Sequence, residues 1–163
     1  MAQDYSFDVV SQFDRQELVN AVNQAQREIA TRYDFKDTGA TIELNEKEIN
    51  LHGPSDFKMK AMLDVLQSKL VKRQLSLKIL KPGPIEPAAK GTVRQKIELQ
   101  EGIADELARE LVKQIKQVSP KVQPRIQGDA IRVSSREKDL LQQVIQALKA
   151  SEGAVPLQFI NYR

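Results

Sequence analysis

The chain has 163 residues, 40% hydrophobic and 29% charged, and this composition is that of a folded protein with a buried core. Its apolar runs are far shorter than the ~18 residues that a membrane-spanning helix needs. Cysteine is absent, which excludes disulfides, zinc–thiolate sites and thiol catalysis, and the N-terminal segment lacks the pattern of a secretory signal. We therefore expect a cytoplasmic protein without membrane association.

The formal net charge of +3 is unevenly distributed along the chain. Residues 1–81 carry 12 basic and 12 acidic side chains, whereas residues 82–163 carry 13 and 10, so the whole excess lies in the second half. A bias of this size is compatible with an anionic partner but does not require one.

The first half of the chain alternates patterns that are typical of strands and helices. Tyr5, Phe7 and Val9 alternate with polar residues, and Leu18 and Val22 begin an apolar stripe of helical spacing that starts near residue 15. In order, the predicted elements are a strand at 5–10, a helix from 15, a hairpin of strands 41–44 and 48–52, a helix at 55–72 and a strand at 75–80.

The second half repeats this order. The predicted elements are a strand at 92–99, a helix at 102–117, a hairpin of segments 121–127 and 130–134, a helix at 136–150 and a strand at 157–162. From residue 49 to about 79 the halves superimpose without a gap at an offset of 82, so that Ile49 matches Ile131 and Leu51 matches Val133. We interpret this match as an internal duplication.

Strand–helix–strand–strand–helix–strand is the order of ferredoxin-like α+β domains, so the sequence predicts two such domains in tandem. Residues 1–81 form the first repeat and 92–163 the second, and 82–91, rich in proline and glycine, are predicted to be a linker. Each sheet carries helices on one face and leaves the other face open. Pro124 falls on a predicted edge strand, where a missing N–H is tolerated.

Enzyme motifs are scarce. The sequence contains no phosphate-binding loop, no dinucleotide fingerprint, no nucleophile elbow and no zinc-protease motif. The single histidine, His52, stands at the end of a hairpin strand without a cluster of ligand-type residues around it. We expect a protein that is not an enzyme and holds no metal or cofactor.

Alternation along the strands predicts which charges occupy the open sheet faces. In the second repeat these are Arg94, Lys96, Arg125 and Arg132, a cationic set, whereas the first repeat shows a mixed set of Asp8, Glu43, Glu48 and Lys78. RNA could bind a cationic sheet face, but no aromatic stacking platform of the RNA-recognition type is present. A solvated face is the alternative.

Two short stretches could contact a nucleotide or could be structural. RYDFKDTG at 32–39 continues the apolar stripe of the preceding helix, which assigns Tyr33 to the core, offers Phe35 as a second core candidate, and leaves Arg32 and Lys36 exposed. The alternative is a cradle in which an aromatic face stacks on a base and the cations meet phosphate. GPSDFKMK at 53–60 could bind an anion at a helix start, although a Ser or Asp cap is the simpler interpretation.

Several longer segments carry a resemblance to a known family. They are SFDVVS at 6–11, RYDFK at 32–36, LDVLQSKLVKR at 63–73, IEPA at 85–88, GTVRQ at 91–95, KVQPRIQGDAIRV at 121–133 and PLQFINYR at the C-terminus. Over its whole length the chain resembles the YajQ family of small bacterial proteins. The resemblance implies two ferredoxin-like domains whose first strands are exchanged, which would place Arg94 and Lys96 with Glu43 and Glu48.

The resemblance also implies function. The family is regarded as nucleotide-binding, with links to RNA and to the second messenger cyclic di-GMP, and its members are not classed as enzymes. The expected ligand is therefore a nucleotide or cyclic dinucleotide; RNA, or protein partners in transcription, are the alternatives. The candidate nucleotide-binding residues are Arg32, Tyr33, Phe35, Lys36, Arg94 and Arg132.

Overall fold

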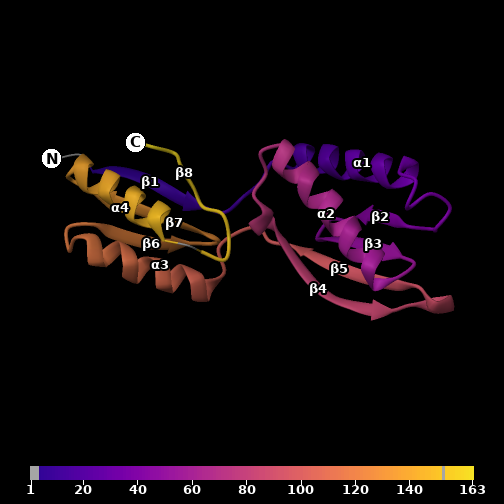
Figure 1. Ribbon diagram of the computed structural model, residues 1–163. Helices are drawn as coiled ribbons and strands as arrows, with labels where there is room; N and C mark the ends of the chain where they lie inside the picture. The colour runs from indigo at the N-terminus through magenta and orange to yellow at the C-terminus, as the bar shows by residue number, and fades with distance from the viewer. Residues whose placement is uncertain (1–3, 152) are drawn as a thin grey trace. The chain divides into compact units, whose positions relative to one another are not determined.

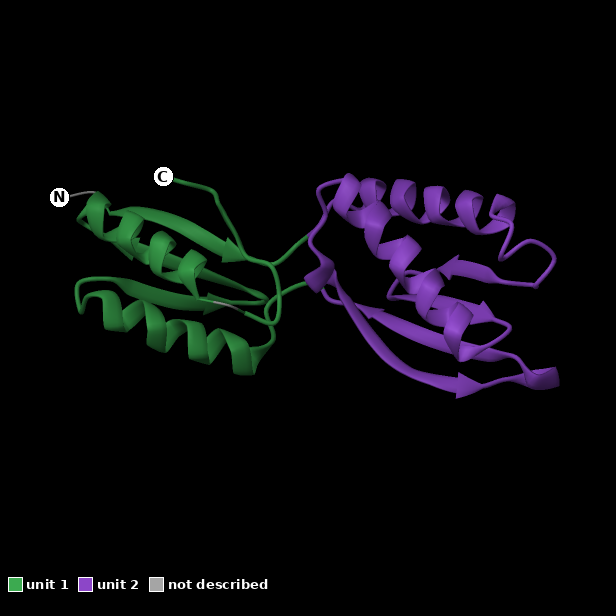
Figure 2. Cartoon of the chain, in the orientation of Figure 1, with its two compact units in different colours: residues 1–12, 101–163 green, residues 13–100 purple. Residues whose placement is uncertain are grey.

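The computed structural model describes residues 4–151 and 153–163, which form eight strands and four α-helices in two compact units (Figures 1 and 2). One unit contains residues 13–100, and we call it the β5 unit. The other combines the described residues up to 12 with those from 101 onward, and we call it the β1 unit. The β5 unit is a single continuous segment, whereas the β1 unit combines segments from both ends of the chain.

The β5 unit contains two helices on one face of a four-stranded antiparallel sheet of order β2-β3-β5-β4 (Figure 1). The Asp14 side chain caps α1 by accepting from the backbone N–H groups of Gln16 and Glu17, and Ser55 caps α2. The elements are α1 Arg15–Thr31, β2 Thr41–Leu44, β3 Glu48–Gly53, α2 Asp56–Lys72, β4 Leu80–Pro87 and β5 Val93–Leu99, with short 3-10 turns at Leu77–Ile79 and Ala89–Gly91.

The β1 unit has the same architecture, with the antiparallel strand order β6-β7-β1-β8 and two helices on one face. Its elements are β1 Tyr5–Val10, α3 Asp105–Val118, β6 Gln123–Gln127, β7 Ala130–Ser135, α4 Lys138–Ala150 and β8 Gln158–Ile160. The α+β fold of two ferredoxin-like domains is thus confirmed.

The first strand of each repeat lies in the sheet of the other repeat. Val9 of β1 is opposite Ile131 of β7, whereas Ile97 of β5 is opposite Ile49 of β3. Each of these strands occupies an inner position of its sheet, so it is flanked by partners on both sides. The strand pairing is the exchanged arrangement that the family resemblance implies.

The segment predicted to be a linker, residues 82–91, instead forms most of β4 and the turn that follows it. Pro82, Pro84 and Pro87 fit there because β4 is an edge strand and proline is tolerated where no ladder N–H is needed. The register shifts between Pro82 and Ile85, which accommodates the Gly83–Pro84 pair. Within residues 75–80, predicted to be a strand, Leu77–Ile79 form a 3-10 turn and Leu80 begins β4.

Each unit has its own hydrophobic core between its helices and its sheet. Ile97 lies in the β5-unit core beside Leu51 and Leu66, and Phe7 and Val9 lie in the β1-unit core. The exchanged strands therefore carry fully buried side chains into the core of the opposite repeat. Among the described residues, no helix is long and apolar enough to cross a membrane.

Candidate functional site

The end of α1 changes direction at Arg32 and places RYDFK in a tight turn. Arg32 has an extended backbone, with ψ of 132°, so the helix stops at Thr31. The N–H groups of Phe35 and Lys36 then both donate to the Arg32 carbonyl, at 3.0 and 2.9 Å. Asp37 follows with a φ of 63°, a left-handed conformation that Asp tolerates better than most residues.

This turn reverses the roles that helical periodicity predicts for the two aromatics. Phe35 is only 2% exposed and packs in the β5-unit core, whereas Tyr33 is 94% exposed. The prediction that Tyr33 belongs to the core is wrong because the helical spacing ends before it. Phe35, which was named as a nucleotide-binding candidate, has no ring face available for a base, and Tyr33 has both.

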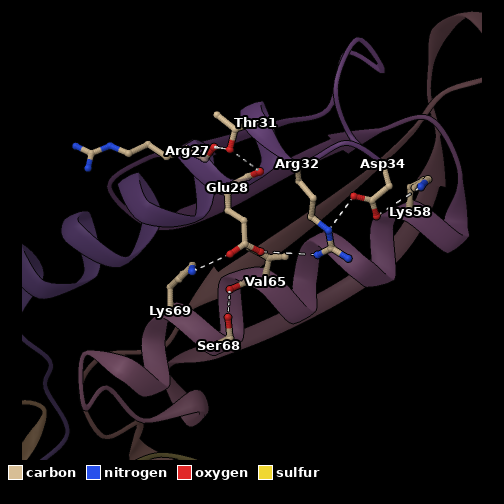
Figure 3. Close-up of polar contacts among 9 residues, drawn as sticks. All are labelled: Arg27, Glu28, Thr31, Arg32, Asp34, Lys58, Val65, Ser68 and Lys69. Carbon is tan, nitrogen blue, oxygen red and sulfur yellow. Dashed lines mark hydrogen bonds and ion pairs between the residues drawn. The ribbon is translucent and has the colours of Figure 1, made fainter.

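A network of ion pairs holds the side chains around the turn (Figure 3). Arg32 lies between two carboxylates, with its Nε 2.8 Å from Asp34 Oδ1 and its Nη1 3.7 Å from Glu28 Oε2. The Arg32–Asp34 contact is short but poorly directed, because Asp34 Oδ1 is buried and accepts no hydrogen bond from the described residues. Lys69 donates a hydrogen bond of 2.9 Å to Glu28, and this bond, with the charge of Lys69, lowers the pKa of Glu28.

The first turn of α2 completes the cluster. Lys58 Nζ lies 3.7 Å from Asp34 Oδ2 and 5.4 Å from the centre of the Phe35 ring, while the Arg32 guanidinium lies 5.3 Å from the same centre. Phe35 thus supports two cations from within the core. The two segments that the sequence singled out, 32–39 and 53–60, meet at this point.

A second exposed aromatic, Phe57, is the chain neighbour of one member of this ion pair. Phe57 is 78% exposed, and it precedes Lys58 in sequence as Tyr33 precedes Asp34. We call Arg32, Tyr33, Lys36, Phe57 and Lys58 the aromatic–cation surface. The sequence analysis did not select Phe57, although a signal was available: Phe57 is two residues before the buried Met59, which turns it to the opposite side of the helix.

Arg94 lies elsewhere in the β5 unit, on the sheet face away from α1 and α2. It sits in β5 opposite His52, and its neighbours Val93 and Gln95 point to the helix side. Its Nε is 3.4 Å from Glu86 Oε2, and both side chains are largely exposed. The structure therefore does not bring Arg94 to the RYDFK turn.

A hollow of about 680 Å³ lies over this open face and is lined by both signs of charge. Lys96 is on the same face with its Nζ 3.3 Å from Glu48. The uniformly cationic face predicted for the second repeat does not form, because the strand exchange places Arg94 and Lys96 among carboxylates. The charged residues that line the hollow are Lys81, Arg94, Lys96, Glu43, Glu86 and Glu98.

Arg132, the last candidate, lies in the β1 unit and has a structural partner. Its Nε donates to Asp8 Oδ1 at 3.0 Å across the β1–β7 pair, and Asn161 donates to Asp8 Oδ2 at 2.8 Å. The Arg132 hydrogen bond is the main reason that the pKa of Asp8 is lowered, and the Asn161 bond acts in the same direction against partial burial. Arg132 thus fixes the exchanged strand to its neighbour.

Asp8→Asn is expected to lower the free energy of unfolding by about 2 kcal/mol at pH 7, because it removes a charge-assisted hydrogen bond from an almost buried position. The folded chain holds Asp8 ionised to lower pH than the unfolded chain does. Its contribution is therefore complete above pH ~4, the usual aspartate pKa, and is lost as the pH falls through the lowered folded pKa.

Urea unfolding of the parent and of Asp8→Asn between pH 3 and pH 7 measures this effect. The parent should lose the extra stability on acidification, so that the two curves converge at low pH. Asp4→Asn is the matched control, since Asp4 is exposed and 3.9 Å from Arg136, and it should change stability by less than about 0.5 kcal/mol. A constant difference between parent and Asp8→Asn at all pH values would contradict the assignment.

Comparison with known proteins bears on this geometry. Residues 5–163 match the family model described as nucleotide-binding protein YajQ-like. The chain belongs to the YajQ family. Proteins named nucleotide-binding protein are 53% identical in Trichodesmium erythraeum, 52% in Thermosynechococcus vestitus and 48% in Desulfitobacterium hafniense, each over 163 residues and the full length of both chains.

Membership in the YajQ family directs attention to surfaces that could hold a base and a phosphate. Of the six candidate residues, Arg32, Tyr33 and Lys36 lie together at the exposed turn, while Phe35 contacts Arg32 from the core. Arg94 and Arg132 lie on two different sheets and each pairs with a carboxylate. The aromatic–cation surface is thus the place where several of the candidates meet.

Proposed function

We propose that this YajQ-family chain is a non-enzymatic cytoplasmic protein that binds a cyclic dinucleotide, cyclic di-GMP, at the aromatic–cation surface. The observation that carries the proposal is the exposure of Tyr33 and Phe57, whose chain neighbours Asp34 and Lys58 form an ion pair. An almost fully exposed aromatic ring leaves its apolar surface in contact with water. A base that stacked on the ring would bury that surface.

The cations of this surface suit the phosphates of the ligand. Arg32 and Lys58 are held in place by Asp34, and Lys36 extends from the turn without an ion pair to any described residue. A phosphodiester placed between Lys36 and Lys58 would gain charge-assisted hydrogen bonds, each of which contributes about 1.5–3 kcal/mol where water is partly excluded. Asp34 and Asp37 limit the net charge, so affinity would depend on stacking as well as on phosphate contacts.

Calorimetric titration with cyclic di-GMP tests the proposal. The parent should bind with a micromolar Kd, and both Tyr33→Ala and the double variant Arg32→Ala/Lys36→Ala should weaken binding by at least about tenfold, the loss of one stacked base or of a phosphate contact. Arg94→Ala is the matched control, because Arg94 is an exposed cation of the same unit on the opposite sheet face. The Arg94→Ala variant should bind cyclic di-GMP with the affinity of the parent.

Titration with GMP and with cyclic di-AMP separates the contribution of the cyclic backbone from that of the base. Absence of binding by the folded parent at any accessible concentration of cyclic di-GMP would exclude the proposal. Equal binding by the parent, Tyr33→Ala and the double variant, together with weaker binding by Arg94→Ala, would move the site to the hollow over the open sheet face.

RNA binding through a cationic sheet face has less support. Arg94, Lys96 and Arg132 each lie within 4 Å of a carboxylate oxygen, at 3.4, 3.3 and 3.0 Å, so their charge is largely balanced locally. RNA affinity that falls steeply with salt concentration would favour this alternative. A role with protein partners in transcription stays a prediction of the family resemblance.

A further inference from the structure

The two sheets contain equivalent positions on their exchanged strands, which can be compared one by one. Ile49 of β3 matches Ile131 of β7 in the duplication, and the residues opposite them are Ile97 and Val9. At the next position, Lys96 of β5 is opposite Asn50 of β3, and Asp8 of β1 is opposite Arg132 of β7. At the position after that, Gln95 is opposite Leu51 and Phe7 is opposite Val133. Asp8 is thus equivalent to Lys96, and Phe7 to Gln95.

The equivalent positions 8 and 96 carry opposite charges, and each charge has a partner in the sheet where it lies. Asp8 accepts a hydrogen bond of 3.0 Å from Arg132, and Lys96 Nζ is 3.3 Å from Glu48. If each first strand returned to the sheet of its own repeat, Lys96 would stand opposite Arg132 and Asp8 would stand beside Glu48. Both opposite-charge pairs would become like-charge pairs, which destabilise neighbouring strands.

The equivalent positions 7 and 95 are also matched to their surroundings. Phe7 is fully buried against Phe159, with ring centres 5.9 Å apart in an edge-to-face arrangement. Gln95 is almost fully buried and donates from Nε2 to the Gly83 carbonyl at 2.9 Å, where the register of β4 shifts. In the returned arrangement, a phenylalanine would leave this carbonyl without the donor, and the glutamine amide would enter an aromatic site.

We propose that these side-chain pairs select the exchanged arrangement over two self-contained ferredoxin-like domains. Pairing with the hairpin strand does not select it, because β1 meets β7 in the same register as β5 meets β3. The short turn after β4 favours pairing of β5 with β4, and the side chains add to this preference. Among the side chains that differ between the two strands, the charges at 8 and 96 and the buried groups at 7 and 95 have specific partners in the sheets where they lie. Side chains of each repeat thereby favour insertion of the first strand of the other repeat.

Cross-strand disulfides report which arrangement a chain adopts, and the absence of natural cysteine leaves the background clean. Ser6 is opposite Ser134, and it exchanges both backbone hydrogen bonds with Arg163 on its other side. Ser6 and Ser134 therefore form a non-hydrogen-bonded pair, the closer kind, which suits a disulfide. In the returned arrangement the residue opposite Ser6 would be His52, the equivalent of Ser134.

The experiment oxidises two reporter chains, Ser6→Cys/Ser134→Cys and Ser6→Cys/His52→Cys, after refolding, and measures crosslinked monomer on non-reducing gels. In the parent background the first should crosslink and the second should not. In a background that transposes the four side chains (Asp8→Lys, Lys96→Asp, Phe7→Gln and Gln95→Phe) the preference should reverse. The ratio of the two crosslinks should change by a factor of at least about a hundred.

A folded four-substitution chain that still forms only the Ser6–Ser134 crosslink would overturn the proposal. If that chain does not fold, a local charge reversal decides. Asp8→Lys alone should lower the folded-to-unfolded equilibrium constant by about tenfold or more, and Asp8→Lys/Arg132→Asp should restore most of it. Absence of recovery in this double variant would show that pairing at position 8 does not select the strand, and would overturn the proposal as well.

Discussion

A chain cut after Lys90 is expected to give two fragments that are unfolded when separate and that fold when they are mixed. Lys90 is exposed and lies in the turn between β4 and β5, so the cut removes no core side chain. Fragment 1–90 then lacks β5, an inner strand of its sheet, and fragment 91–163 lacks β1, an inner strand of the other sheet. Each fragment alone would expose one flank of two neighbouring strands and an incomplete core.

Mixing the fragments restores both sheets at once, because each fragment supplies the strand that the other lacks. Phe7 and Val9 enter one core and Ile97 enters the other, and burying each of these side chains contributes about 2 kcal/mol. Backbone ladders on both sides of each inserted strand add to this. Association should therefore be tight enough for a 1:1 complex to survive gel filtration.

Circular dichroism and urea titration of each fragment, alone and mixed, measure the effect. The separate fragments should show no cooperative transition, and the mixture should unfold cooperatively with the near-native content of helix. Fragment 1–90 carrying Asp8→Lys is the control, and it should assemble more weakly because it meets Arg132 with a like charge. Cooperative unfolding of either isolated fragment would show that a repeat can fold with its own first strand.

The sequence was sufficient to predict the repeat, the order of the elements and most of the core. Periodicity alone did not indicate whether the first strands are exchanged between the repeats or stay in their own repeat. Alternation shows that Phe7 and Val9 face a core, but it does not show which core, because both sheets offer the same register. That information lies in long-range pairs such as Asp8 with Arg132 and Gln95 with Gly83, which no local pattern contains.

The candidate site was predicted in part for a related reason. The pattern of RYDFK predicted the end of a helix with exposed cations, and Arg32 and Lys36 are indeed exposed. The positions of the aromatics depended on where α1 ends, since one additional helical turn would have placed Tyr33 on the apolar stripe. Phe57 was missed because its segment was interpreted as a cap, and capping by Ser55 does not exclude an exposed aromatic two residues later.

Truncation of Phe7 is expected to destabilise the β1 unit, whose helices come from the C-terminal repeat. Phe7→Ala removes a fully buried ring from the core that contains Ile131 and Phe159, and changes of this kind cost about 3–5 kcal/mol. Amide protons of α3 and α4 should therefore exchange faster, by a factor on the order of a hundred or more. The amides of α1, which directly follows β1 in sequence, should keep their protection, because α1 belongs to the β5 unit.

Ile97→Ala is the matched variant, since Ile97 is the fully buried residue of β5 at the position equivalent to Val9. It should produce the crossed result: faster exchange in α1 and α2, with α3, which directly follows β5, still protected. The cost of an Ile→Ala change in a core is about 2–5 kcal/mol, so both effects are large enough to separate by hydrogen exchange. Loss of protection in the helix next in sequence, rather than in the opposite repeat, would be incompatible with exchanged strands in solution. A crossed pattern, in contrast, would mean that β1 stabilises the C-terminal repeat, because the sheet that β1 completes is made by that repeat.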